Sequence, residues 1–248
     1  MKYGICGAAI LAAVVLAPVA EARDLVVGVE AIDYSPVYGL VDGRFIGAAR
    51  EILDAFAEAK GHRLTYQPLP VKRLLAELIH GGIDLKFPDS PDWQQAMRQG
   101  QVISYSKPVI AYVDGTVVSR DKLGGGVEAI HRLGTVSGFT PYAWSARIKS
   151  GAVDLKENPN FDQLLRQVQT GRVDGAYVNI AVALYAADPS MGLAFDRDLP
   201  HIAESYRLSS GKAPEVIAEF DDWLSRNGKL VAEIIARTGA EKGVRSPQ

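Results

Sequence analysis

Two stretches of the sequence concentrate aromatic and charged side chains, and each lies next to a predicted strand. The first, residues 33–38 (DYSPVY), brings Tyr34 and Tyr38, whose rings pack against apolar or cationic groups while their hydroxyls form hydrogen bonds. The second, residues 86–93 (KFPDSPDW), brings Lys86, Asp89 and Trp93. A structural interpretation stays open for each group: loop packing for the tyrosines, a solvated ammonium for Lys86, and a cover over a core for Trp93.

Other chemistry has little support in the sequence. The four histidines, at positions 62, 80, 131 and 201, share no metal-ligand spacing, so we expect no metal site and no cofactor. Neither a G-x-S-x-G motif nor a phosphate-binding glycine loop is present. Asp84 and Asp174 begin matching strands, which indicates a shared structural role at a helix–strand turn.

The elements that must position these residues form a repeat. Residues 74–87 (LLAELIHGGIDLKF) and 164–177 (LLRQVQTGRVDGAY) lie ninety positions apart and share a paired Leu, a Gly, a β-branched residue and an Asp. This pattern predicts an amphipathic helix that ends at Gly and turns into a buried strand. One such unit in each half suggests two similar α/β lobes that face each other across a cleft.

Strands and helices alternate along the rest of the chain, which predicts mostly parallel sheets with ligands bound at the carboxyl ends of the strands. The segment 109–119 (VIAYVDGTVVS) is extended, with an Asp-Gly turn signal at its centre. We expect the other strands at 25–29, 62–67, 83–87, 133–137, 173–178 and 202–208, and helices at 48–59, 71–80, 141–149, 161–170, 181–187, 213–225 and 228–238.

The amino terminus has the pattern of a signal peptide. Lys2 precedes an apolar run from Ile5 to Ala20, and Ala20-Glu21-Ala22 offers a cleavage site after Ala22. We therefore expect an exported protein whose mature chain has no cysteine, because Cys6 lies in the removed segment; an uncleaved anchor is the alternative. The formal charge of -2 and the lack of basic clusters argue against a nucleic-acid partner.

Taken in order, the motifs LVVGVE, YSPVY, DGRFIGAAREILDAFAEAKG, LLAELIHGGIDL, ISYSKPV, LGTVSGFT and GRVDGAYVN resemble the extracellular solute-binding proteins of family 3. The resemblance covers essentially the whole chain after residue 22. It implies a two-lobed α/β fold of the type II periplasmic binding proteins, with lobe 1 at 23–108 and 196–248, lobe 2 at 109–195, and two hinge crossovers. It also implies a periplasmic monomer that closes over a small amino-acid-like ligand and delivers it to an ABC importer permease in the inner membrane.

The resemblance also suggests ligand contacts, and several positions depart from the family pattern. Tyr34 and Tyr38 match its aromatic loop, and Thr140 matches a hydroxyl at a helix start that helps to hold the ligand carboxylate, although Thr140 also suits a plain helix cap. Arg98 lies one position from the usual carboxylate-binding Arg, and Asn179 replaces an Asp that pairs with the ligand ammonium. Arg98 is equally compatible with a solvated helix residue.

Where the family usually has small hydroxylated residues and then an Arg, this chain reads Lys86-Phe87-Pro88-Asp89-Ser90-Pro91-Asp92-Trp93, in which Ser90 is the one hydroxylated residue. We therefore expect a polar or zwitterionic ligand other than a standard α-amino acid.

Two further hypotheses stay open. Some cyclohexadienyl dehydratases resemble this family and add a carboxyl general acid in the cleft, for which Asp89 is the candidate in this sequence. The protein could alternatively present its ligand to a membrane receptor as a sensory subunit.

Overall fold

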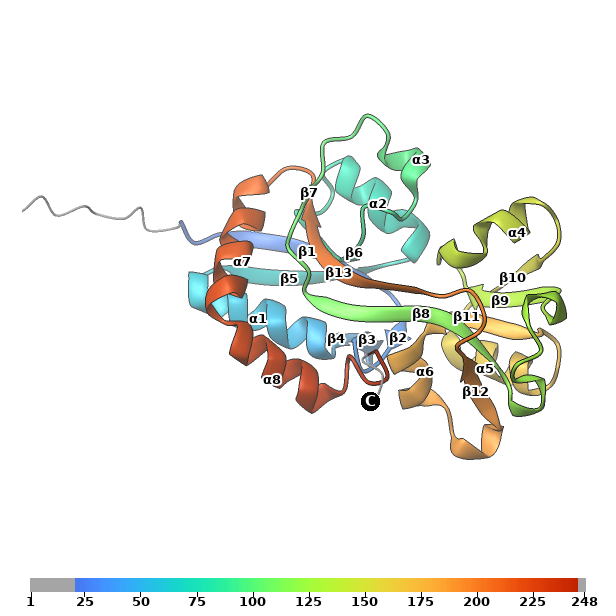
Figure 1. Ribbon diagram of the computed structural model, residues 1–248. Helices are drawn as coiled ribbons and strands as arrows, with labels where there is room; N and C mark the ends of the chain where they lie inside the picture. Colours follow the sequence, from blue (N-terminus) through green and yellow to red (C-terminus); the bar gives the residue numbers. More distant parts are fainter. Residues whose placement is uncertain (1–20, 245–248) are drawn as a thin grey trace, which may run out of the picture.

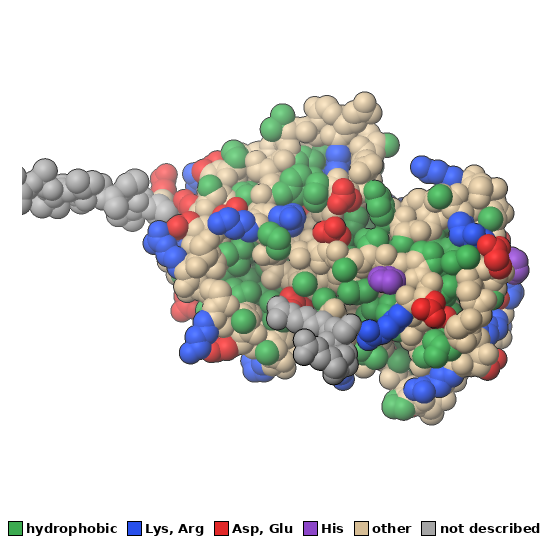
Figure 2. Space-filling view, viewed as in Figure 1, with side chains coloured by type: hydrophobic (Ala, Val, Ile, Leu, Met, Phe, Trp, Pro, Cys, Tyr) green, Lys and Arg blue, Asp and Glu red, His purple; other side chains and the backbone are tan. Residues whose placement is uncertain are grey.

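The computed structural model describes residues 21–244 as an α/β molecule with two lobes (Figure 1). Residues 1–20, which hold most of the expected signal peptide, lie outside the described residues. Among residues 21–244, no helix has the length and apolar character needed to cross a bilayer. On the face drawn in Figure 2, basic and acidic side chains of the described residues are interspersed.

The first lobe is built on three parallel strands. Strand β1 (Asp24–Glu30) lies between β5 (Arg63–Leu69) and β6 (Leu85–Asp89). Helices α1 (Ala48–Lys60) and α2 (Val71–Ile79) connect these strands, as parallel pairing requires. Helix α1 buries residues at helical spacing and ends at a left-handed glycine; its buried residues are Ala48, Ala49, Ile52, Leu53, Phe56 and Ala57.

The second lobe repeats this plan. Strand β9 (Arg132–Val136) pairs in parallel with β10 (Asp154–Asn158) and with β11 (Gly175–Asn179). Helix α5 (Phe161–Gln169) precedes β11 as α2 precedes β6, which confirms the predicted helix–strand repeat. The remaining helices of this lobe are the short α4 (Ser145–Lys149) and α6 (Ile180–Ala186).

The two aspartates of the repeat have the same structural role. The Oδ2 atom of Asp84 accepts a hydrogen bond from the Val26 N–H at 2.6 Å, and Oδ2 of Asp174 accepts one from the Arg132 N–H at 2.8 Å. In both lobes the side chain therefore ties the start of one strand to the backbone of its parallel neighbour, as the sequence predicts.

Two long antiparallel strands join the lobes. Strand β8 (Ile110–Ser119) pairs with β13 (Ile202–Ser210), and both run from one lobe to the other (Figure 1). They place all the main strands in one path, β10-β9-β11-β8-β13-β6-β1-β5. The short strand β7 (Ser104–Tyr105) pairs with β13, and the short strand β12 (Leu193–Asp196) pairs with β8. Helices α7 (Pro214–Arg226) and α8 (Gly228–Thr238) lie over the first lobe (Figure 1). The lobe boundaries at 108/109 and 195/196 stay a prediction.

Strand β8 is continuous, so the turn that the Asp114-Gly115 pair predicts at its centre does not form. Asp114 pairs with Asn179 and with Ile202 as an ordinary strand residue. The glycine that follows has a packing role, because a Cβ atom on Gly115 would lie 2.3 Å from the ring of Phe195. The Asp-Gly pair therefore marks a close approach between elements.

Two other segments differ from the sequence prediction. The aromatic loop is part of a small antiparallel sheet made of β2 (Asp33–Tyr34), β3 (Tyr38–Val41) and β4 (Arg44–Ile46). The helix expected at 141–149 is a 3-10 turn, Tyr142–Trp144, followed by α4. Pro141 has ψ of 68°, which is not helical, so no α-helix begins there.

Candidate ligand-binding cleft

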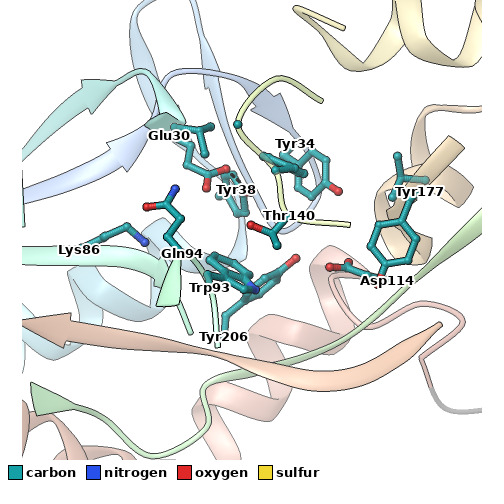
Figure 3. A pocket seen from close by; sticks show the side chains of 14 residues that line it. Glu30, Tyr34, Tyr38, Lys86, Trp93, Gln94, Asp114, Thr140, Tyr177 and Tyr206 are labelled. Carbon is teal, nitrogen blue, oxygen red and sulfur yellow. Dashed lines mark hydrogen bonds between the residues drawn. The ribbon is translucent and has the colours of Figure 1, made fainter. Parts of the chain in front are cut away.

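A small cavity of about 40 Å³ lies between the lobes, at the carboxyl ends of β1, β6 and β11 (Figure 3). It has the concave shape and mixed apolar and polar lining of a small-molecule site. The residues that line it are Glu30, Tyr34, Tyr38, Val71, Lys86, Trp93, Gln94, Asp114, Gly138, Phe139, Thr140, Tyr177, Val178 and Tyr206.

Direct hydrogen bonds close the cleft on the side of β11. The Tyr34 hydroxyl accepts a hydrogen bond from the Asn179 N–H at 2.9 Å, and Asn179 Nδ2 donates to the Tyr206 hydroxyl at 3.0 Å. The Asn179 Oδ1 accepts from the Val182 N–H and caps α6. All the polar groups of the Asn179 side chain thus have protein partners, and this residue does not line the cavity.

The loop after β9 closes the cleft on the side of α2. Gly138 has φ of +91°, and a Cβ atom there would lie 3.0 Å from both Val71 and Lys72. Next to this contact, Lys72 Nζ lies 2.8 Å from Glu157 Oε2, and Glu157 Oε1 accepts a hydrogen bond from the Gly138 N–H. A glycine is therefore needed for the two lobes to approach this closely.

Glu30, the last residue of β1, brings a buried carboxyl group to the cavity. It is 2% exposed, and its Oε2 accepts a hydrogen bond from the Tyr38 hydroxyl at 2.5 Å. Burial raises the pKa of Glu30 to about 7, against the smaller opposing effects of that hydrogen bond and of the Lys86 charge. Glu30 can therefore hold or release a proton near neutral pH.

Asp114, at the centre of β8, brings a second carboxyl group. Its Oδ1 atom is shielded from solvent and has no hydrogen-bond partner. Burial, with a smaller contribution from the charge of Glu30, raises the pKa of Asp114 to about 7. In Figure 3 both carboxyl groups turn toward the cavity, with tyrosine side chains between them.

Asp89 lies outside the cavity lining, in a buried ion cluster. Its carboxylate contacts Lys86 Nζ at 2.7 Å, the Ser209 hydroxyl at 2.6 Å and the Arg98 guanidinium. Burial works to raise the pKa of Asp89, but the Lys86 and Arg98 charges outweigh it and hold the pKa below its usual value. An ionised carboxylate with these partners has no proton to give, so the structure contradicts Asp89 as a general acid.

Arg98 belongs to the same cluster and does not reach the cavity. Its guanidinium contacts Asp89, the Tyr105 hydroxyl and the Trp93 carbonyl oxygen. With these partners, Arg98 is not placed to hold the carboxylate of a ligand in this cavity. The prediction that Arg98 binds a ligand carboxylate rests on its distance from Tyr105 in the sequence. In the structure, helix α3 (Gln95–Arg98) turns Arg98 toward Asp89 instead.

The structure brings five of the nine predicted ligand-binding residues to the cavity, namely Tyr34, Tyr38, Lys86, Trp93 and Thr140. The other four, Asp89, Ser90, Arg98 and Asn179, do not line it. Thr140 reaches the cavity from a loop rather than from a helix start, since α4 begins only at Ser145. The anion site expected from free helix N–H groups is therefore absent at Thr140.

Sequence reasoning missed both of the carboxyl groups. Glu30 appears in the sequence as the end of a buried strand, LVVGVE, and a charged residue in that position was the available signal. Asp114 belongs to the Asp-Gly pair that predicts a turn in the sequence. Among residues 21–244, no cluster of His, Cys, Asp and Glu is arranged to hold a metal ion.

No family model matches the chain, and no curated protein matches its sequence. Solved structures do match. An ancestral arginine-binding protein bound to arginine is 19% identical with a TM-score of 0.71, over 87% of this chain and 97% of that one. An amino acid ABC transporter substrate-binding protein from Streptococcus pneumoniae, bound to L-arginine, is 20% identical with a TM-score of 0.69, over 90% and 97%.

A third match is an ancestral amino acid-binding protein described as a precursor of cyclohexadienyl dehydratase. It is 17% identical with a TM-score of 0.69, over 87% of this chain and 95% of that one. Identities this low show the fold alone. The chain has the two-lobed α/β fold of the amino-acid-binding periplasmic proteins of ABC transporters.

Proposed function

We propose that the protein captures a small polar, amino-acid-like ligand between its lobes in the periplasm and delivers it to an ABC importer. The observation that carries this proposal is the closed cavity between the lobes, lined by aromatic rings and polar groups. Proteins with this fold close around their ligands by hinge motion, and here β8 and β13 are the crossing strands that such a hinge would use. The signal-peptide pattern supports export, and the matched structures support a transporter partner.

Thermal unfolding of the purified protein tests the binding role. The panel contains amino acids, amines, organic acids, aromatic acids and small osmolytes, and each hit is followed by calorimetry. A ligand that binds only the folded protein adds about 2.7 kcal/mol of stability at a hundredfold excess over its dissociation constant. We expect at least one class to raise the melting temperature. If ligand-depleted, well-folded protein responds to no class, the binding role is wrong.

A second candidate is an enzyme on the same scaffold, and Glu30 is the observation that favours it. A buried carboxyl group with a pKa of about 7 can act as a general acid, for example toward the leaving hydroxyl of a dehydration. One matched structure is a dehydratase precursor. Incubation with prephenate and arogenate, followed by detection of the aromatic product, separates the two functions. Turnover that Glu30→Gln abolishes would support the enzyme.

A further inference from the structure

We infer that the ligand is an organic cation, an amine or quaternary ammonium compound, whose charged nitrogen lies between Asp114 and Glu30 and which needs no carboxylate. This inference rests on the proposed binding function and specifies its ligand class. It differs from the zwitterionic ligand that the sequence suggests, because the cavity offers partners for the positive end of an amino acid and few for its negative end.

The first argument is the balance of charge around the cavity. Two carboxyl groups line it, Glu30 and Asp114, whereas Lys86 is the one basic side chain among the described residues that do so. The Lys86 ammonium already donates to Asp89 Oδ1 and to the Pro88 carbonyl oxygen, each at 2.7 Å. With both carboxyl groups ionised, the lining therefore carries a net negative charge that a monovalent cation neutralises.

The second argument is the set of polar atoms without regular partners. Oδ1 of Asp114 and Oε1 of Gln94 are both buried without a hydrogen bond, and both residues line the cavity. The Tyr177 hydroxyl, in a residue 3% exposed, is buried without a hydrogen-bond partner of regular geometry. The Asp114 and Gln94 oxygens are acceptors, and buried acceptors left without a donor are rare in native proteins. Ligand N–H groups supply donors to such atoms.

The third argument is the aromatic wall. The rings of Tyr34, Tyr38, Tyr206 and Trp93 surround the space between the two carboxyl groups (Figure 3). The ring of Trp93 already has a cation over it, since Lys86 Nζ lies 5.5 Å from the ring centroid. Faces of aromatic rings attract ammonium groups, and several rings together form the cages that bind quaternary ammonium ligands.

The usual partners of a carboxylate are lacking by comparison. Arg98 is committed to Asp89, and no α-helix begins at Thr140 to offer free N–H groups. A carboxylate in this cavity would also face two groups of its own charge, Glu30 and Asp114. Removal of the carboxylate from a ligand should therefore improve its binding.

Matched pairs of compounds that differ by this one group test the inference. Calorimetry at pH 8 compares agmatine with arginine, cadaverine with lysine, histamine with histidine, and choline with glycine betaine. In at least one pair we expect the cation to bind tenfold or more tightly than its carboxylate-bearing partner. Tighter or equal binding of the carboxylate-bearing partner in every pair that binds would overturn the inference and leave the proposed function intact. The inference is also overturned, and the proposed function left intact, if all the ligands found by thermal unfolding are anions.

Two variants locate the site. Asp114→Asn removes one charge from the cavity, and Glu204→Gln removes one from an exposed position on the neighbouring strand β13. We expect Asp114→Asn to weaken binding of the preferred cation about tenfold to a hundredfold, and Glu204→Gln to leave it unchanged. The melting temperature of ligand-free Asp114→Asn should not fall, because the substitution removes a buried unpaired charge. A melting temperature that does not fall therefore distinguishes lost binding from misfolding. Unchanged binding in Asp114→Asn contradicts the inference.

Discussion

Glu30 and Asp114 bring two buried carboxyl groups to the cleft, and both groups change charge near neutral pH. Burial raises the pKa of each to about 7. Glu30 faces the Tyr38 hydroxyl, the Lys86 ammonium and the ionised Asp89. Asp114 faces Glu30 and four tyrosines, Tyr34, Tyr112, Tyr177 and Tyr206. Burial raises the pKa of each of these tyrosines above its usual value, so they stay neutral where the two carboxyl groups change charge.

Binding of a cation should therefore strengthen as the pH rises through 7. A cation binds the ionised carboxylate, and the ionised fraction of a group with a pKa of 7 rises about tenfold between pH 6 and 8. We expect the dissociation constant to fall about tenfold over this range for each carboxylate that must ionise. Calorimetry in buffers of different ionisation enthalpy should also detect proton release on binding. Affinity that does not vary with pH would show that neither carboxyl group contacts the charged nitrogen.

The ligand-free protein should show the opposite trend in stability. The pKa of Glu30 is about 7 in the folded protein and 4.5 in its usual state, so between these pH values the folded chain holds a proton that the unfolded chain has lost. The stability that Glu30 contributes is fully present below pH 4.5. As the pH rises through 7, this contribution of about 3 kcal/mol to the free energy of unfolding is lost.

Glu30→Gln stays neutral, and its side-chain oxygen can still accept from Tyr38. We expect this variant to match the wild-type melting temperature at pH 5 and to exceed it at pH 8, with Glu204→Gln as the charge control. Equal melting temperatures at pH 8 would show that Glu30 does not destabilise the ligand-free fold.

Some individual residues could be foreseen from the sequence and others could not. Tyr34, Tyr38, Lys86 and Trp93 lie next to predicted strands, and the ends of parallel strands meet at one edge, so their approach to the cavity follows from the topology. The role of Asp89 could not be foreseen, because α3 turns Arg98 back onto its carboxylate and a further partner, Ser209, is 120 positions away in the sequence. Such partners are known only once the chain has folded.

At the scale of elements, the loop after β9 must come close to α2, and Gly138 is the residue that permits this. Gly138→Ala adds a Cβ atom 3.0 Å from Val71 and Lys72 and also strains a backbone with φ of +91°. Gly151→Ala is a matched control, because Gly151 has φ of +76° and nothing lies within 4 Å of its added Cβ. Both variants should lose about 1 kcal/mol of stability from backbone strain.

Only Gly138→Ala should also weaken ligand binding, because it alone hinders closure of the cleft. Calorimetry with the ligand found by thermal unfolding measures the difference between the two glycine variants. If both variants bind as the wild type does, the contact between the loop and α2 is not part of the ligand-bound state.

Elements with strong periodicity were predictable, and elements that depend on pairing were not. The helix–glycine–strand units at α2–β6 and α5–β11 follow from apolar spacing alone. The strands of the small sheet β2–β4 are two to four residues long, and β10 is mostly polar, so the sequence does not distinguish them from loops. Gly115 was misleading because it accommodates Phe195, a contact that the local sequence cannot show.

At the scale of the whole molecule, a distance measurement between the lobes tests closure. The sequence contains one cysteine, Cys6, in the expected signal peptide, so a chain that begins at Arg23 with Lys72→Cys and Glu157→Cys carries a single labelling pair. These positions form an ion pair between exposed side chains across the cleft, which contributes little to stability. Spin labels should show a broad, long distance distribution without ligand and a short, narrow one with ligand. A distribution that saturating ligand leaves unchanged would argue against hinge closure.

The contacts that hold the lobes together have a consequence for the proposed transport function. The Tyr34–Asn179 and Lys72–Glu157 contacts join protein groups alone, so they favour the closed shape whether or not a ligand is bound. An importer that recognises this shape would dock empty receptors and hydrolyse ATP without moving cargo. Ionised Glu30 and Asp114 oppose such idle cycling, because closing over two uncompensated charges is unfavourable. Acidification removes that safeguard, so futile ATP hydrolysis by the reconstituted importer would increase as the surroundings become acidic.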